Sequence, residues 1–146
     1  MSKETLYKIG DLHITAPADW LDVTREIDDD NPPFTLGRLN GIGVIQFSIA
    51  DYRSGKIPGI TLDDLGNFLV DFAQSRELGP GYDLASQENS LLICAASFDF
   101  EDRFLRVWYC SNGQSMTLVT YNCQNGDQQA ELPDCESIVR KLKFVS

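Results

Sequence analysis

The stretch that decides the fold is residues 91–123, LLICAASFDFEDRFLRVWYCSNGQSMTLVTYNC, in which three strand-like runs follow one another closely. The runs are Leu91–Phe100, Arg103–Ser111 and Gln114–Cys123, and turn residues stand between them at Glu101-Asp102 and Asn112-Gly113. Strands joined by such short turns pair antiparallel. This part of the chain therefore predicts an antiparallel sheet.

With these turns as tips, the side chains of the three strands separate onto two faces. The first face is apolar and is a predicted core, made of Cys94, Ala96, Phe98, Leu105, Val107, Tyr109, Met116 and Leu118. The second face is amphipathic and carries Ala95, Ser97, Asp99, Arg106, Trp108, Val119 and Tyr121. A face of this kind is either covered by a second helical layer or exposed to a partner, and the sequence leaves both alternatives open.

Two segments carry apolar residues at helical spacing. The clearer one is Thr61–Leu78, where Thr61 is a natural N-cap and Asp63 and Asp64 lie in the positive first turn. The other is the segment Glu131 to Phe144, from which we expect a terminal helix over about Leu132–Leu142 that docks on the sheet.

The first fifty residues predict two hairpins separated by a loop. Leu6–Ile9 and Leu12–Ala16 form the first hairpin, and Phe34–Leu39 and Ile42–Ala50 form the second around Asn40-Gly41. Between them, Glu26–Pro33 (EIDDDNPP) combines acidic residues with two prolines, which predicts a solvated loop. Together with the helices, these elements predict one α+β domain over residues 1–146, with a mostly antiparallel sheet flanked by helices.

The charge of the chain bears on its partners and setting. With 22 acidic and 12 basic residues, the net charge is −10, which repels phosphate backbones and anionic membrane surfaces and attracts basic proteins. We therefore expect no nucleic acid and no membrane as partners. The N-terminus lacks the features of a signal peptide and no run is long enough to span a membrane, so we expect a cytoplasmic protein.

Four cysteines are spaced without a CxxC pair: Cys94, Cys110, Cys123 and Cys135. Three of them lie in predicted strands, and the expected setting is reducing. We therefore expect free thiols packed as small apolar side chains, in preference to disulfides or a zinc site.

The sequence offers no convincing arrangement for catalysis. His13 is the single histidine and lies in a predicted strand, so no Ser-His-Asp or Cys-His set can be argued. Gly41-Ile42-Gly43 opens a strand and lacks the third glycine of a dinucleotide-binding loop. Asp28 to Asn31 is rich in oxygen ligands, but Pro32-Pro33 follows where an EF-hand has its glycine-centred spacing. We expect a protein that is no enzyme and has no cofactor and no metal.

Several short motifs are shared with a known superfamily. They are Trp108-Tyr109-Cys110, Asn112-Gly113, the run Met116–Cys123 with its Thr120-Tyr121 pair, the closing run Cys135–Phe144, and the early run Ile14–Trp20 with its strand, proline and tryptophan. In these features the chain resembles the PsbP/DcrB-like superfamily, while Pro32 to Pro58 departs from its pattern. The resemblance covers most of the chain. It implies a central antiparallel sheet flanked by helices and a non-enzymatic role as an adaptor, assembly factor or chaperone of secreted toxins.

Four classes of function follow from this reading. The first is a bacterial immunity protein that neutralises a cognate toxin, and the second is a secretion chaperone or adaptor; an uncharacterised binding module and an enzyme come after them. An immunity protein should present clustered acidic residues and aromatics on one face, a chaperone a wide apolar groove, and an enzyme a pocket of polar groups with shifted pKa.

The residues expected to bind the partner surround the acidic loop and the end of the central strand. They are Glu26, Asp28, Asp29, Asp30, Asp51, Tyr52 and Arg53. The expected partner is another protein, a cognate toxin or secreted effector, and the chain itself is expected to be a monomer or homodimer.

Overall fold

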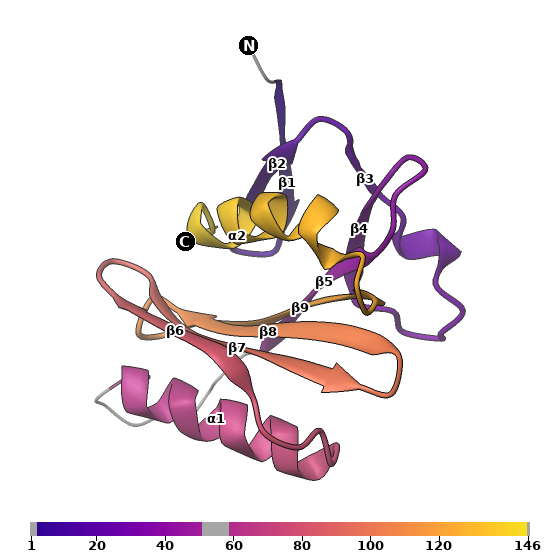
Figure 1. Ribbon diagram of the computed structural model, residues 1–146. Coiled ribbons are helices and arrows are strands. Elements are labelled where there is room, and N and C mark those ends of the chain that lie inside the picture. Colours follow the sequence, from indigo (N-terminus) through magenta and orange to yellow (C-terminus); the bar gives the residue numbers. More distant parts are fainter. Residues whose placement is uncertain (1–2, 51–58, 146) are drawn as a thin grey trace.

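A seven-stranded antiparallel sheet forms the centre of the computed structural model, which describes residues 3–50 and 59–145 (Figure 1). Its strands run in the order β3 (Trp20–Asp22), β4 (Phe34–Arg38), β5 (Val44–Ala50), β9 (Met116–Gln124), β8 (Arg103–Ser111), β7 (Leu92–Phe100) and β6 (Tyr82–Glu88). A smaller sheet contains β1 (Glu4–Ile9), β2 (Leu12–Pro17) and β10 (Lys143–Phe144). Short 3-10 helices span Thr24–Glu26 (η1) and Gln128–Ala130 (η2). The predicted α+β fold class is confirmed.

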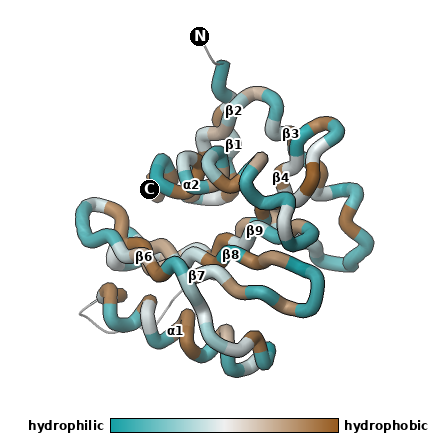
Figure 2. The backbone as a smooth tube through the Cα atoms, viewed as in Figure 1, coloured by the Kyte–Doolittle hydropathy of each residue, from teal (hydrophilic) through white to brown (hydrophobic). Residues whose placement is uncertain are grey.

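Helix α1 (Leu62–Ser75) packs on one face of the large sheet, over β7 and β8. Its apolar stripe, visible as recurring brown segments in Figure 2, buries Leu65, Leu69 and Phe72. The eight strand residues predicted to form a core all belong to the cluster beneath this helix. The alternation of the strands therefore predicted this face correctly.

Helix α2 (Leu132–Arg140) and the small sheet lie over the opposite face (Figure 1). Trp108 and Tyr121 from this face are buried against Cys135, Ile138 and other apolar side chains. The amphipathic face is thus covered by a second layer. Of the two alternatives left by the sequence, coverage by a helical layer is the correct one.

The structure corrects several of the expected elements. Helix α1 ends at Ser75, short of Leu78, and the short strand β3 was not expected. Helix α2 ends at Arg140, short of Leu142, because the chain then extends into β10 and pairs with β2. The third strand of residues 91–123 begins at Met116, after the turn at Gln114. Strand β6 was not expected, because it is an edge strand with exposed residues and lacks the alternation of a half-buried strand.

The four cysteines are free in the structure, as expected. Cys110, Cys123 and Cys135 are buried, and Cys94 is half-buried. Burial raises the pKa of all four thiols. They therefore serve as small core side chains at neutral pH.

The first turn of α1 supports one stability prediction. Thr61 Oγ1 accepts a hydrogen bond from the Asp64 backbone N–H at 3.2 Å, and Asp64 Oδ2 accepts one from the Thr61 N–H at 2.9 Å. Replacing Thr61 with alanine removes one half of this capping box and should lower the free energy of unfolding by about 1 kcal/mol in urea denaturation. Thr61→Ser, which keeps the hydroxyl, should cost less than half as much; equal losses for both variants would contradict the capping role.

Candidate functional site

Helix α1 covers only part of its face of the large sheet, and the part over β5, β4, β3 and the end of β9 at Asn122 lies open among the described residues. The strand register aligns one row of residues across this open half: Leu105, Asn122, Val44, Gly37 and Leu21. The row contributes small or half-buried residues, with the exposed Leu21 at its end. It therefore forms the floor of a shallow surface and lacks the bulk that a buried face would need.

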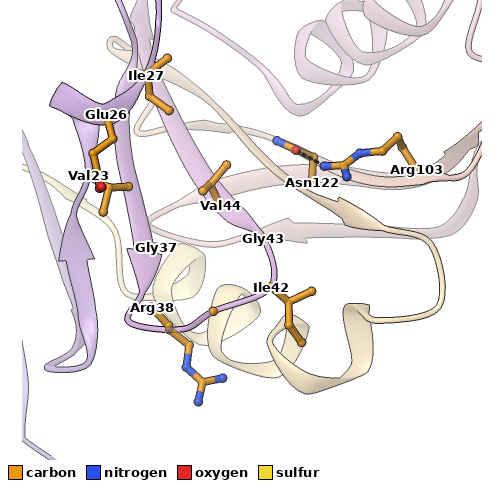
Figure 3. A pocket seen from close by; sticks show the side chains of 11 residues that line it. Val23, Glu26, Ile27, Gly37, Arg38, Ile42, Gly43, Val44, Arg103 and Asn122 are labelled. Atoms are coloured by element: carbon orange, nitrogen blue, oxygen red, sulfur yellow. Dashed lines mark hydrogen bonds between the residues drawn. The ribbon is translucent and has the colours of Figure 1, made fainter.

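A groove of about 370 Å³ lies over the middle of this row, at Asn122, Val44 and Gly37. Glu26 and Ile27 lie on one side of the groove and Arg103 and Asn122 lie on the other (Figure 3). The β4–β5 turn closes one end, where Ile42, which is 45% exposed, lines the groove. The groove is open to solvent and has the shape of a docking surface.

The two arginines of the groove differ in their partners. Arg38 Nε donates to Asp19 Oδ2 at 3.1 Å, and Arg38 Nη1 lies 3.8 Å from Glu131 Oε2. Arg103 Nη2 donates to the neutral Asn122 Oδ1 at 2.8 Å. Among residues 3–50 and 59–145, no carboxylate is within ion-pair distance of Arg103. Arg103 is therefore available to pair with an anionic group of a partner.

A buried carboxylate holds the turn that ends the groove. Glu131, whose side chain is fully buried, accepts hydrogen bonds from the backbone N–H groups of Ile42 at 3.1 Å and Gly43 at 2.8 Å. It also accepts one from the Tyr121 hydroxyl at 2.8 Å. Burial and hydrogen bonding raise the pKa of Tyr121 well above its usual range, so the phenol stays protonated and donates. These hydrogen bonds therefore fix the position of the β4–β5 turn, which forms the end of the groove.

Gly41-Ile42-Gly43, which does not match a dinucleotide-binding loop, has a structural role in this turn. A Cβ on Gly43 would lie 2.3 Å from the Asn122 carbonyl oxygen, and one on Gly41 would lie 2.9 Å from Glu131 Oε2. Only glycine lets the backbone approach so closely at these two positions. The two glycines bring the donors of the turn within reach of the buried carboxylate.

A second buried polar cluster joins β6 to α2. Arg106, which is 5% exposed, donates from Nε to Glu136 Oε1 at 3.0 Å and from Nη1 to Ser97 Oγ at 3.0 Å and to the Asp83 carbonyl at 2.6 Å. The Trp108 indole N–H donates to the other Glu136 oxygen at 3.2 Å. The cluster lies beneath α2 and is mostly buried, with part of Glu136 accessible, so we assign it to the framework.

The expected site residues divide into two groups. Glu26 lines the groove, and Asp28, Asp29 and Asp30 are exposed in the adjoining loop, where Asp29 Oδ1 accepts from the Asn31 N–H at 3.1 Å. Asp51, Tyr52 and Arg53 lie outside the described residues. A second hollow of about 340 Å³ borders the loop, lined by its residues Asn31, Pro32 and Pro33 and by Phe34, Ile9 and the β5 residues Phe47, Ser48 and Ile49. Residues 31–33 of the loop therefore lie beside β5 at this hollow.

Sequence reasoning did not identify the residues at the centre of the groove. Arg38, Ile42, Arg103 and Asn122 come from four different strands or turns, and no local motif joins them. Only the register across β8, β9, β5 and β4 brings them together. The one available signal was the pair Leu39 and Ile42, which flank the turn at Asn40-Gly41. Apolar residues are uncommon at a solvated turn, so this pair could have pointed to a binding surface.

His13 lies beside two lysines in the small sheet. His13 is half-buried on β2, and its cross-strand neighbours are Lys8 and Lys143. Within residues 3–50 and 59–145, no group of three or more histidine, cysteine, aspartate or glutamate side chains is placed to hold a metal ion. None of the described helices has the length and apolar character needed to cross a membrane.

Comparison with known proteins places the fold. No family model matches the chain, and no curated protein matches it in sequence. The Saccharomyces cerevisiae Ran-binding protein Mog1p superposes with a TM-score of 0.65 at 7% identity, covering 100% of this chain and 97% of Mog1p. The PsbP protein CyanoP of Synechocystis sp. also gives 0.65, at 10% identity, covering 99% of this chain and 94% of CyanoP.

A third similar structure comes from Bacteroides thetaiotaomicron, with a TM-score of 0.65 and 13% identity over 99% of this chain and 49% of that one. At such identities the similarity concerns the fold alone. The expected resemblance to PsbP is confirmed at that level: the chain has the fold shared by CyanoP and Mog1p.

Proposed function

We propose that this chain is a non-catalytic protein-binding domain whose partner docks on the open half of the large sheet. The observation that carries the proposal is the groove beside the acidic loop: Glu26 lines it, and Asp28, Asp29 and Asp30 are exposed next to it. Mog1p, which has this fold, is a Ran-binding protein, so the fold is compatible with binding another protein. We choose this surface from the geometry of the site and not from the similarity of the fold.

The finer proposal is a cytoplasmic bacterial immunity protein that neutralises a cognate toxin with a basic surface. A net charge of −10 and an exposed acidic loop attract a cationic partner and accelerate its association. Arg103, which has a neutral partner in the groove, would pair with a carboxylate of the toxin and fix its orientation. Charges of both signs at one surface favour a specific partner over non-specific adsorption.

A secretion chaperone or adaptor is the second candidate, and exposed apolar side chains support it. Leu39 is 76% exposed at the β4–β5 turn, next to Ile42, and Leu21 is exposed on the edge strand β3. Three exposed apolar residues at one end of the sheet suit a hydrophobic segment of an effector. A secretion chaperone of this kind should retain a bound hydrophobic peptide through purification.

Affinity capture from the source organism separates the two candidates. The tagged chain should retain one basic protein that dissociates in high salt, and mass spectrometry identifies it. Recovery of a hydrophobic peptide that survives high salt would favour the chaperone. If neither ligand is recovered and the purified chain binds no protein, the protein-binding proposal fails.

The groove itself is tested with a single substitution. Ile42→Ser removes an exposed apolar contact at the groove end and should weaken binding of the captured partner by about tenfold or more, measured by surface plasmon resonance. Leu6→Ser is the matched control, because Leu6 is similarly exposed (52%) but lies on β1 outside the groove. Equal losses for both variants would place the interface elsewhere.

A further inference from the structure

A second groove lies at the opposite edge of the large sheet, between α1 and β6. It has a volume of about 280 Å³ and is lined mainly by apolar side chains, among them Val70, Ala73, Leu84, Ala96 and Phe98. None of these residues belongs to the groove of the proposed function. A partner at this edge would therefore bind independently of one on the open half of the sheet.

The strand that borders this groove is the outermost strand of the sheet. No described strand pairs with the free side of β6, so backbone donors and acceptors along it point to solvent. Leu84 on β6 is 75% exposed, and Val70 on the facing side of α1 is 53% exposed. An unpaired strand edge beside an apolar groove is the arrangement used for strand addition by an extended peptide.

Contacts within the fold hold this edge in place. The register of β6 with β7 shifts between Tyr82 and Ala85, and Asp83 has a positive φ of 50°. The buried Arg106 donates to the Asp83 carbonyl at 2.6 Å, and the Tyr82 hydroxyl donates to Asp99 at 2.6 Å. Both bonds hold the chain at Tyr82 and Asp83, immediately before Leu84 in the bulge. A preorganised edge loses less entropy when a peptide binds.

The charge around the edge selects the chemistry of the peptide. Asp83 and Glu88 are exposed on β6, Asp99 is exposed on the neighbouring β7, and Glu77 is exposed just after α1. Two basic residues are exposed nearby: Arg76, whose guanidinium lies over the Phe72 ring at 3.8 Å, and Arg140, which lines a small hollow with Ala85 and Gln87. The rim is thus predominantly acidic. It disfavours a second copy of this chain, which carries a net charge of −10, and favours a cationic strand.

We infer that β6 is a strand-addition site for an extended partner segment in which apolar residues alternate with lysine or arginine. The backbone of the segment pairs with the free side of β6, and its apolar side chains enter the groove beside Leu84 and Val70. Because successive side chains of a strand alternate between the two faces, its basic side chains point to the other face of the sheet, where Asp99 is exposed. The inference goes beyond the proposed function, since it adds a second binding surface with a different ligand.

A synthetic peptide tests the inference with the full chain. The probe is a fluorescent seven-residue peptide of alternating lysine and valine, whose binding is followed by anisotropy. Leu84→Ser should weaken binding by about tenfold or more, because a buried leucine contact is lost. Leu39→Ser is the matched control, since Leu39 is exposed to the same extent (76%) at the far β4–β5 turn, and it should change affinity less than about twofold.

Two further measurements report strand pairing itself. A peptide of the same composition with a central proline should lose most of its affinity, because proline removes a main-chain donor. Amide hydrogen exchange in Ala85–Glu88 should slow when the alternating peptide binds. The inference is overturned if the alternating peptide does not bind, if the proline peptide binds equally well, if Leu84→Ser and Leu39→Ser behave alike, or if exchange slows elsewhere. Ile42→Ser should leave peptide binding unchanged, so failure here is distinguishable from failure of the proposed function.

Discussion

Replacing Glu131 with alanine should destabilise the protein by about 3–5 kcal/mol, a large part of the stability of an ordinary domain. The fully buried carboxylate accepts hydrogen bonds from the Ile42 and Gly43 N–H groups and from the Tyr121 hydroxyl. The alanine variant leaves these buried donors without acceptors, and burying an unpaired polar group is costly. Urea denaturation followed by circular dichroism measures the loss.

Two milder variants separate the contributions of the individual hydrogen bonds to this loss of stability. Tyr121→Phe removes one donor and leaves the carboxylate bound to the turn, so it should cost about 1 kcal/mol. Glu131→Gln keeps an oxygen acceptor but places an amide N–H₂ beside donors, and its cost should lie between those of the other two. If Glu131→Ala costs no more than Tyr121→Phe, the carboxylate does not hold the turn.

Replacing Arg106 with alanine should cost about 3 kcal/mol or more, at the lower end of the range for breaking a buried ion pair. The lower end is expected because Glu136 is partly exposed, with 29% of its side chain accessible, and water can solvate it after the change. The variant also removes two hydrogen bonds that join β8 to its neighbours: the one to Ser97 on β7 and the one to the Asp83 carbonyl on β6. Thermal and urea unfolding of the variant measure the cost.

The matched control is the exposed ion pair between Lys141 and Glu4, whose atoms are 2.7 Å apart. Lys141→Ala should cost less than about 1 kcal/mol, because surface pairs are screened by water and salt. Equal costs for Arg106→Ala and Lys141→Ala would mean that burial of the Arg106 cluster contributes little.

The sequence was sufficient for the parts of the fold that rest on local periodicity. Alternation in β7, β8 and β9 separated their two faces correctly, and the stripe and N-cap at Thr61 located α1. Strand β6 could not be foreseen, because an edge strand with exposed residues carries no alternation to detect. The end of α2 was also misplaced, since pairing of β10 with β2 overrides the helical spacing of the last residues.

The candidate site was predictable only where it is local in sequence. The run from Glu26 to Asp30 signalled a solvated acidic loop, and Glu26 does line the groove. Arg103 and Ile42 are far apart along the chain and meet only through strand register. Likewise, the hydrogen bonds that join Glu131 to the turn at Gly43 span 88 residues of sequence, a distance over which periodicity carries no information.

Association kinetics of the captured partner test the central claim most directly. The comparison is between the natural chain and the Asp28→Asn/Asp29→Asn/Asp30→Asn variant, each in low and in high salt. If the acidic loop steers a basic protein onto the neighbouring groove, the variant should associate about tenfold more slowly in low salt, with a smaller rise in dissociation rate, and the difference should shrink in high salt. Equal association rates at both salt concentrations would contradict the account.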